Sequence, residues 1–180
     1  LQIINTIKME RANGGTRFLV PVEINGTAQK LLLDTGGATT SLSSQTVNAL
    51  GLKEESSRFK LYDLYGNASD SQVTVKTFDM GNARGEGLKF QVSPMQNLET
   101  EAGANGLLST DLFLQYDVDM DFGADRLNYF SQDHCEGRVA YWPERPIAIV
   151  PVTLENGHIN VPVTIDGHQL RAIIDTAHGF

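Results

Sequence analysis

Hydrophobic residues in the first part of the chain fall in short β-rich runs separated by turn residues, a pattern that is typical of β-strands. Residues 18–34, FLVPVEINGTAQKLLLD, contain two such runs separated by Asn25 and Gly26. This pair suits the positive φ angles of a tight turn. The pattern therefore predicts a β-hairpin whose second strand leads directly to Asp34.

Short helical signals and further strands follow. Residues 43–52, SSQTVNALGL, offer serine caps, an apolar pair three positions apart and a glycine stop, which together predict a short helix. Residues 58–90 return to strands and turns, with a hairpin tip near Gly66. Residues 107–114 predict a buried strand end and one or two helical turns, and residues 117–122 alternate as a half-buried strand.

The sequence repeats itself at its far end. Residues 159–177, INVPVTIDGHQLRAIIDTA, align without gaps with residues 18–36, FLVPVEINGTAQKLLLDTG. Apolar matches alone can arise by chance between two hairpins, whereas the proline, the glycine and the Asp-Thr in register indicate a duplication. The second copy begins near Ile147 and carries Asp175 where the first copy carries Asp34.

Composition bounds the class of protein. The chain has 180 residues, enough for one core of about 100–150 residues and part of another. Its 22 acidic and 14 basic residues leave a net charge of −8, which disfavours nucleic acid and anionic membrane surfaces as partners. No apolar run approaches the roughly 18 residues of a membrane span. The single cysteine, Cys135, excludes an internal disulfide framework.

The Asp-Thr-Gly turn at residues 34–36 has a specific chemical use. A carboxylate at the end of an apolar strand loses solvation, so its pKa rises unless hydrogen-bond donors offset the burial. Thr35 and Gly36 supply a hydroxyl and a backbone N–H beside Asp34, and glycine permits a close turn. Two such carboxylates facing each other share one proton, and the pair can activate a water while protonating a carbonyl oxygen.

These residues carry a resemblance to a known family. LLLDTGGATTSLS, residues 31–43, resembles the apolar-apolar-Asp-Thr-Gly-Ala/Ser-Ala/Ser motif of aspartic proteases, and the surrounding unit is similar to the retropepsin-like family, particularly its bacterial members. The family's second signature, an apolar pair followed by Gly-x-Asp, is matched at residues 107–111 with Ser109 in place of the glycine. The resemblance implies an all-β, mainly antiparallel acid-protease lobe, closed like a barrel, with one or two short helices.

The resemblance also implies an activity, that of an aspartic endopeptidase in which a water is activated between two aspartates. Asp34 carries over as a catalytic aspartate, with Thr35 and Gly36 as its hydrogen-bonding supports, and Asp111 carries over as a structural residue. The repeat makes Asp175 the candidate for the second catalytic aspartate, although its motif reads Asp-Thr-Ala-His-Gly. This chemistry uses neither a metal nor another cofactor.

The resemblance and the repeat together divide the chain. We expect an N-terminal extension at 1–17, a retropepsin-like lobe at 18–132, a linker at 133–146 and the start of a second, truncated lobe at 147–180. The expected partners are a peptide or protein substrate and a second lobe, which comes from the rest of the chain or from a homodimer. A start at Leu1, without an initiator methionine, fits removal of a leader, so we expect a secreted or periplasmic protein.

The family's flap, a hairpin that closes over the substrate, corresponds to the segment around Tyr62, Tyr65 and Gly66. Two departures from the family pattern, Ser109 and Ala177 in place of glycines, leave an alternative function open. It is a catalytically silent lobe that serves peptide binding or self-association. A further alternative is an inhibitory fragment whose chain end occupies its own cleft.

Other residues with chemical potential favour structural roles. Residues 117–125, DVDMDFGAD, resemble a calcium loop, but the glycine falls one place late and no glutamate fills the final ligand position. His134 and Cys135 point apart on an extended segment, and no other cysteine exists to complete a metal site. The histidines of the second copy, among them His158, have no mutual metal spacing, and we assign them no role.

Overall fold

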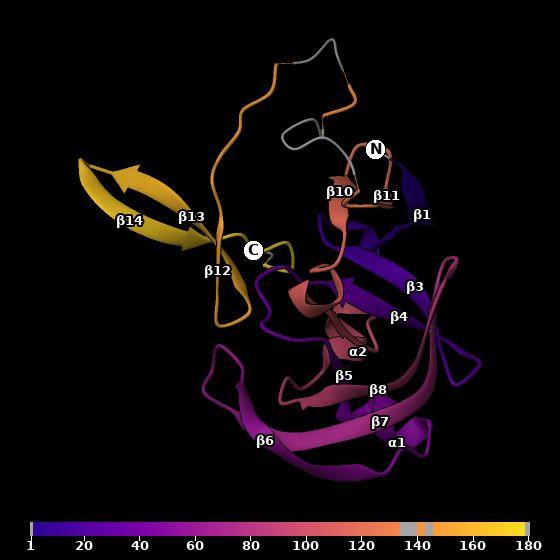
Figure 1. Cartoon of the computed structure of the whole chain (residues 1–180). Helices are drawn as coiled ribbons and strands as arrows, with labels where there is room; N and C mark the ends of the chain where they lie inside the picture. Colours follow the sequence, from indigo (N-terminus) through magenta and orange to yellow (C-terminus); the bar gives the residue numbers. More distant parts are fainter. Residues whose placement is uncertain (1, 134–139, 143–145, 179–180) are drawn as a thin grey trace.

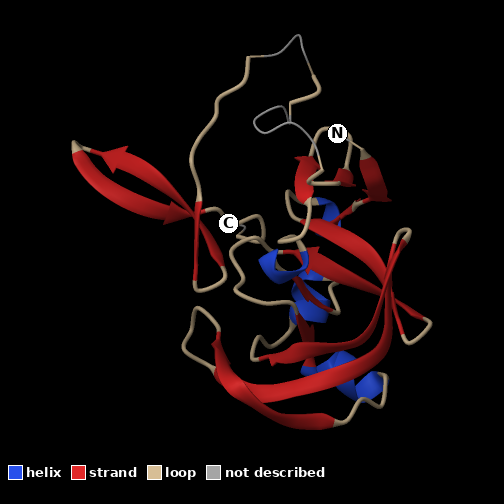
Figure 2. Cartoon of the chain, in the orientation of Figure 1, coloured by secondary structure: helices blue, strands red, loops and turns tan. Residues whose placement is uncertain are grey.

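The computed structural model describes residues 2–133, 140–142 and 146–178. Strands dominate these ranges, and two short α-helices, α1 (Ser44–Ala49) and α2 (Leu98–Ala102), accompany them (Figures 1 and 2). The predicted all-β class with one or two short helices is confirmed. The remaining elements are β1 (Ile3–Lys8), β2 (Glu10–Arg11), η1 (Ala12–Gly14), β3 (Phe18–Ile24), β4 (Thr27–Leu33), β5 (Ser41–Ser43), β6 (Glu54–Tyr62), β7 (Ala68–Met80), β8 (Ala83–Ser93), β9 (Gly106–Leu108), η2 (Thr110–Leu112), β10 (Asp117–Asp121), β11 (Arg126–Phe130), β12 (Thr153–Glu155), β13 (His158–Ile165) and β14 (His168–Ile173).

Eight strands form one sheet that closes on itself. Their order is β2-β3-β4-β9-β5-β8-β7-β6, and an additional antiparallel pairing joins β3 to β7 (Figure 2). The hairpin β3–β4 has the predicted turn, in which Asn25 and Gly26 take φ angles of 51° and 75°. Most neighbours are antiparallel, while β4–β9 and β5–β8 are parallel. The barrel-like closure implied by the family resemblance is therefore confirmed.

The second half of β4, residues 31–33, is buried on both faces, which explains why three leucines follow one another there. Leu31 and Leu33 belong to the larger core cluster inside the closed sheet. Leu32 points the other way and packs with Leu19 and Leu107 in a smaller cluster. A strand covered on both faces reads as a continuous apolar run instead of an alternating one. The run carries β4 through the interior to Asp34.

A glycine allows β9 to lie between β4 and β5. At Gly106 a Cβ would lie 2.2 Å from the backbone oxygen of Ser41 and 3.0 Å from Leu31 Cδ2, so no side chain fits there. Strand β9 approaches the neighbouring strands closely because Gly106 has no side chain. This threading brings the end of β9, and the residues after it, beside the loop that follows β4.

The N-terminal segment, which the sequence placed before the lobe, contributes strands to it. Strand β1 pairs antiparallel with β11 in a three-stranded sheet of order β1-β11-β10, and β2 pairs with β3. Ile7 and Met9 are buried in the larger core cluster. Residues of the expected extension 1–17 thus pack with the lobe expected at 18–132. Local sequence does not show this pairing, because the partner of β1 lies more than a hundred residues further along the chain.

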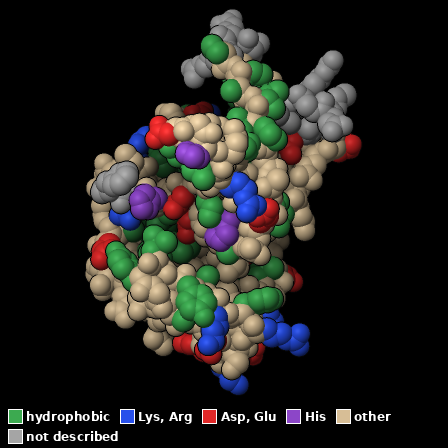
Figure 3. All heavy atoms as spheres, turned by 90° about the vertical axis from the view of Figure 1, so that its left-hand side faces the viewer, with side chains coloured by type: hydrophobic (Ala, Val, Ile, Leu, Met, Phe, Trp, Pro, Cys, Tyr) green, Lys and Arg blue, Asp and Glu red, His purple; other side chains and the backbone are tan. Residues whose placement is uncertain are grey.

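The second copy of the repeat forms a separate small sheet of order β12-β13-β14. Asp166 and Gly167 take φ angles of 50° and 80° and close the β13–β14 turn, as the alignment with Asn25-Gly26 predicts. These strands project from the lobe in Figure 1, and hydrophobic side chains lie open on the face that Figure 3 presents. Most of the predicted linker, 133–146, falls outside the described residues.

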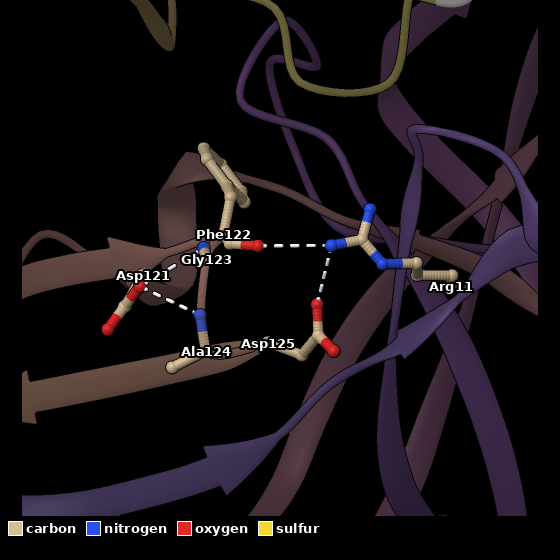
Figure 4. Close-up of polar contacts among 6 residues, drawn as sticks. All are labelled: Arg11, Asp121, Phe122, Gly123, Ala124 and Asp125. Carbon is tan, nitrogen blue, oxygen red and sulfur yellow. Dashed lines mark hydrogen bonds and ion pairs between the residues drawn. The ribbon is translucent and has the colours of Figure 1, made fainter.

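The acidic turn between β10 and β11 is held by contacts within the fold. Asp121 accepts hydrogen bonds at its Oδ1 from two backbone N–H groups of the turn (Figure 4). Arg11 donates to the backbone oxygen of Phe122 and forms an ion pair with Asp125 at 2.9 Å. These contacts tie β2 to the β10–β11 hairpin. Of the helices in the described residues, none has the length and apolar character needed to cross a membrane.

Candidate active site

Asp34 is the first residue after β4, and its side chain is 8% exposed. Its backbone N–H donates to the Leu108 oxygen at 2.9 Å, which extends the β4–β9 pairing by one step. The Gly37 backbone N–H donates to Asp34 Oδ1 at 2.8 Å. The carboxyl group is thus fixed by the turn at the place where the apolar strand ends.

Two threonines link this turn to the corresponding turn of the second copy. Thr35 Oγ1 donates to the Ile174 backbone oxygen at 2.7 Å and accepts from Thr176 N–H at 3.2 Å. Thr176 Oγ1 donates to the Leu33 backbone oxygen at 2.8 Å and accepts from Thr35 N–H at 3.1 Å. Each threonine hydroxyl therefore donates to a backbone oxygen of the other copy and accepts the backbone N–H of the other threonine. The four bonds relate the two Asp-Thr turns by an approximate two-fold axis.

The threonine contacts bring Asp175 against the first turn, where the C-terminal segment meets the loop after β4 (Figure 1). A Cβ at Gly36 would lie 2.5 Å from Asp175 Cγ and 2.8 Å from its Oδ2. That approach is possible only because residue 36 has no side chain. The two aspartates that the sequence repeat pairs are thus brought to one site, in one chain.

The turn of Asp175 repeats the hydrogen bonding of the first turn. Ala177 and His178 donate their backbone N–H groups to Asp175 Oδ1 at 2.8 and 3.0 Å. Its surroundings differ, however, since the Asp175 side chain is exposed. The extra methyl of Ala177 packs against the smaller core cluster of the lobe. The alanine that replaces glycine at position 177 therefore contributes packing to the fold.

Burial and charge act together on the first carboxyl. Desolvation, followed by the charge of Asp175, raises the pKa of Asp34 to about 6. The backbone N–H groups of Gly37 and Gly36 and the charge of His158 oppose this rise and lower the pKa. A carboxyl group with such a pKa holds a proton in mildly acidic solution and can donate it to a substrate.

Asp111 anchors the loop that continues from the first turn. Its carboxylate accepts hydrogen bonds from the backbone N–H and the hydroxyl of Thr40, at 2.9 and 2.6 Å, and from the hydroxyl of Thr39 at 2.9 Å. Thr40 Oγ1 in turn accepts the backbone N–H of Ser109 at 3.1 Å. Asp111 thus ties η2 to the loop that continues from the Asp34-Thr35 turn.

His158 is a residue of the site that sequence reasoning missed. It follows the Asn156-Gly157 turn, whose tip packs against Ala38 and accepts a hydrogen bond from Thr110 Oγ1. Its Nδ1 atom is buried and has no hydrogen-bond partner among the described residues. The alignment of the two copies begins one position later, so no spacing links His158 to Asp34 in the sequence.

The predicted flap segment forms the expected hairpin. Strands β6 and β7 meet at a turn in which Asp63 Oδ1 accepts the backbone N–H groups of Tyr65 and Asn67. Gly66 takes a φ angle of 85°, and Tyr65 is 92% exposed, with Tyr62 also exposed. In Figure 1 the tip lies on the same side of the lobe as β12 and β13. Closure over a substrate by this hairpin stays a prediction.

A closed, mainly antiparallel sheet that carries one Asp-Thr turn, with a second Asp-Thr turn docked against it, is the arrangement that the resemblance to acid proteases implies. A family model described as aspartyl protease matches residues 20–112, more than half of the chain. The chain belongs to the aspartyl protease family that this model describes.

Comparison with solved structures supports the same fold. The chain is similar to a retropepsin-like aspartic protease from Rickettsia conorii, with a TM-score of 0.51 and 19% identical residues. The match covers 69% of this chain and 89% of that one. At this identity the likeness concerns the fold. No curated protein matches the chain.

Proposed function

We propose that the chain is an aspartic endopeptidase whose catalytic pair consists of Asp34 and Asp175 of one chain. The observation that carries this proposal is the reciprocal bonding of Thr35 and Thr176, together with the approach of Asp175 to Gly36. Family membership supports the protease class. The substrate is a peptide or protein segment bound in extended form, and the β6–β7 hairpin covers it.

The reaction follows from a pair of carboxyl groups that share one proton. The ionised carboxylate takes a proton from a water, whose oxygen attacks the carbonyl carbon of the peptide bond, while the protonated carboxyl gives its proton to the carbonyl oxygen. The tetrahedral diol then collapses: the carboxyl that took a proton from the water gives it to the amide nitrogen, a diol hydroxyl returns its proton to the other carboxylate, and the C–N bond breaks to release an acid and an amine. Since Asp34 has a pKa of about 6, activity declines as the pH rises above that value.

Three matched Asp→Asn variants test the assignment. Asp34→Asn and Asp175→Asn should each lower cleavage of an unfolded protein substrate at least about a thousandfold, because either change removes one member of the pair. Asp166→Asn, in the exposed β13–β14 turn of the second copy, is the control and should cleave like the unchanged chain. If Asp34→Asn cleaves normally, the mechanism is wrong.

Mixing experiments separate an intramolecular pair from a homodimer through Asp34. For an intramolecular pair, a mixture of the Asp34→Asn and Asp175→Asn chains stays inactive. Activity of Asp175→Asn alone would show instead that the second aspartate is Asp34 of another copy. The silent-lobe alternative makes a different prediction, since a lobe without a competent pair gives no heat of binding with a statine-type inhibitor. The secreted or periplasmic location stays a prediction that these experiments do not address.

A further inference from the structure

Ser109 and Gly37 share one small space beside Asp34. A Cβ at Gly37 would lie 2.4 Å from Ser109 Oγ and 2.7 Å from Asp34 Oδ2. The Ser109 hydroxyl thus fills the volume that a side chain at position 37 would occupy. Asp34 Oδ2, the carboxyl oxygen that does not accept the Gly37 N–H bond, borders the same space.

The Ser109 hydroxyl is completely buried and lacks a hydrogen-bond partner within the described part of the chain. A buried polar group without a partner is destabilising, so such groups need an explanation. The serine itself is held firmly, because its backbone N–H donates to Thr40 Oγ1. The hydroxyl can act as a donor, and the acceptor Asp34 Oδ2 borders the same space.

We propose that Ser109 is a positioning residue, whose hydroxyl donates a hydrogen bond to Asp34 Oδ2 when that carboxyl group is ionised. Its relevance to catalysis rests on the proposed function. The absence of a side chain at Gly37 leaves room for the Ser109 hydroxyl, since any side chain there would displace it. The Gly37 N–H orients one oxygen of the carboxylate, and Ser109 orients the other.

The hydroxyl works alongside the charged groups that face Asp34. Asp175 disfavours the ionised form of Asp34, and the charge of His158 favours it. A neutral hydroxyl that donates to the carboxylate also favours the ionised form, without adding charge to the site. Ser109 therefore keeps the proton of Asp34 labile in spite of its burial.

Direct titration of the Asp34 carboxyl by ¹³C NMR tests this role without requiring activity. Ser109→Ala should raise the titration midpoint by about one pH unit relative to the unchanged chain. Ser41→Ala is a matched control, because Ser41 also has a fully buried hydroxyl without a partner among the described residues, but it lies on β5. Ser41→Ala should leave the midpoint where it is.

A second readout sharpens the test. In peptide cleavage, Ser109→Ala should shift the alkaline limb of the pH profile upward by the same amount as the NMR midpoint.

Two outcomes would overturn the proposal: an unchanged midpoint in Ser109→Ala, or an equal shift in Ser41→Ala. If the chain cleaves no peptide but Ser109→Ala still moves the midpoint, the proposed function fails and the role of Ser109 stands. If cleavage depends on both aspartates but the midpoint does not move, the proposed function stands and the role of Ser109 is rejected.

Discussion

The two Asp-Thr turns of the chain use the same hydrogen bonds in different surroundings. In both, backbone N–H groups of the following residues hold Oδ1 of the aspartate, and the threonine bonds across to the other copy. Asp34 nevertheless lies in the interior, whereas Asp175 is exposed. The local sequence determines how each carboxyl is held. The packing around it determines how much solvation it loses, and hence how strongly it keeps a proton.

The hairpins that carry these turns differ in the same way. Ile24 and Leu31 of β3 and β4 are completely buried, while Ile165 and Leu170, which lie on β13 and β14, are 57% and 49% exposed. Both hairpins have their strands paired in the same register around a two-residue turn. The strand pairing and the turn of each hairpin thus follow from the repeated sequence. The burial of the first hairpin follows from other strands, which cover the first copy alone.

Exchanging the residue after each Asp-Thr should give the largest contrast between the turns. Gly36→Ala adds a Cβ that would lie 2.5 Å from Asp175 Cγ, so the two carboxyl groups must move apart. A displacement of this kind lowers activity about a hundredfold. Ala177→Gly removes a methyl that packs against the smaller core cluster, which costs stability by about 0.8 kcal/mol and leaves the pair in place.

Peptide cleavage and chemical unfolding of the two variants, measured side by side, check this contrast. Equal losses of activity in both variants would mean that the two turns approach each other symmetrically, contrary to the contacts of Gly36 and Ala177.

Much of this site could be predicted from sequence, because its parts are local or repeated. The β3–β4 turn at Asn25-Gly26 and the strand leading to Asp34 follow from turn chemistry and hydrophobic pattern. The proximity of Asp175 follows from the repeat. The pairing of β1 with β11 and the position of His158 could not be predicted, since both depend on contacts between distant segments without a periodic signal.

The pH dependence of stability should also distinguish the buried aspartate from the exposed one. The pKa of Asp34 is about 6 in the fold, against 3.8 as its ordinary value, so the folded chain binds more protons than the unfolded chain between these pH values. The free energy of unfolding therefore falls as the pH rises from about 4 to 6, and it stays lowered above 6.

Asp34→Asn removes this penalty, because an amide carries no charge to bury. At pH 7 the variant should be more stable than the unchanged chain by about 2–3 kcal/mol, and at pH 4 the two should be nearly equal. Urea unfolding at both pH values measures the difference. Asp175→Asn should give part of this gain, because the charge of Asp175 is the second cause of the raised pKa of Asp34. A gain for Asp34→Asn that persists at pH 4 would show that burial of charge is not its cause.

Removal of the Thr35 or Thr176 hydroxyl should have the smallest effect of these changes. It tests whether the two hydroxyls contribute equally to the docking of one Asp-Thr turn on the other. Thr35→Val and Thr176→Val keep the shape of the side chain but remove its hydroxyl, which leaves the Ile174 or the Leu33 backbone oxygen without its donor. Each change should lower the stability of the docked C-terminal segment by about 1–2 kcal/mol. Limited proteolysis of residues 147–178 measures this opening directly.

Thr153→Val, on the exposed strand β12, is the control and should not change the rate of cleavage by the added protease. The double variant of Thr35 and Thr176 should lose less than the two single variants together, because both hydroxyls belong to one network. Strict additivity would contradict the reciprocal bonding. A much larger loss for Thr35 than for Thr176 would show that the buried turn holds the exposed one, and that the approximate two-fold axis of the contacts does not extend to their energies.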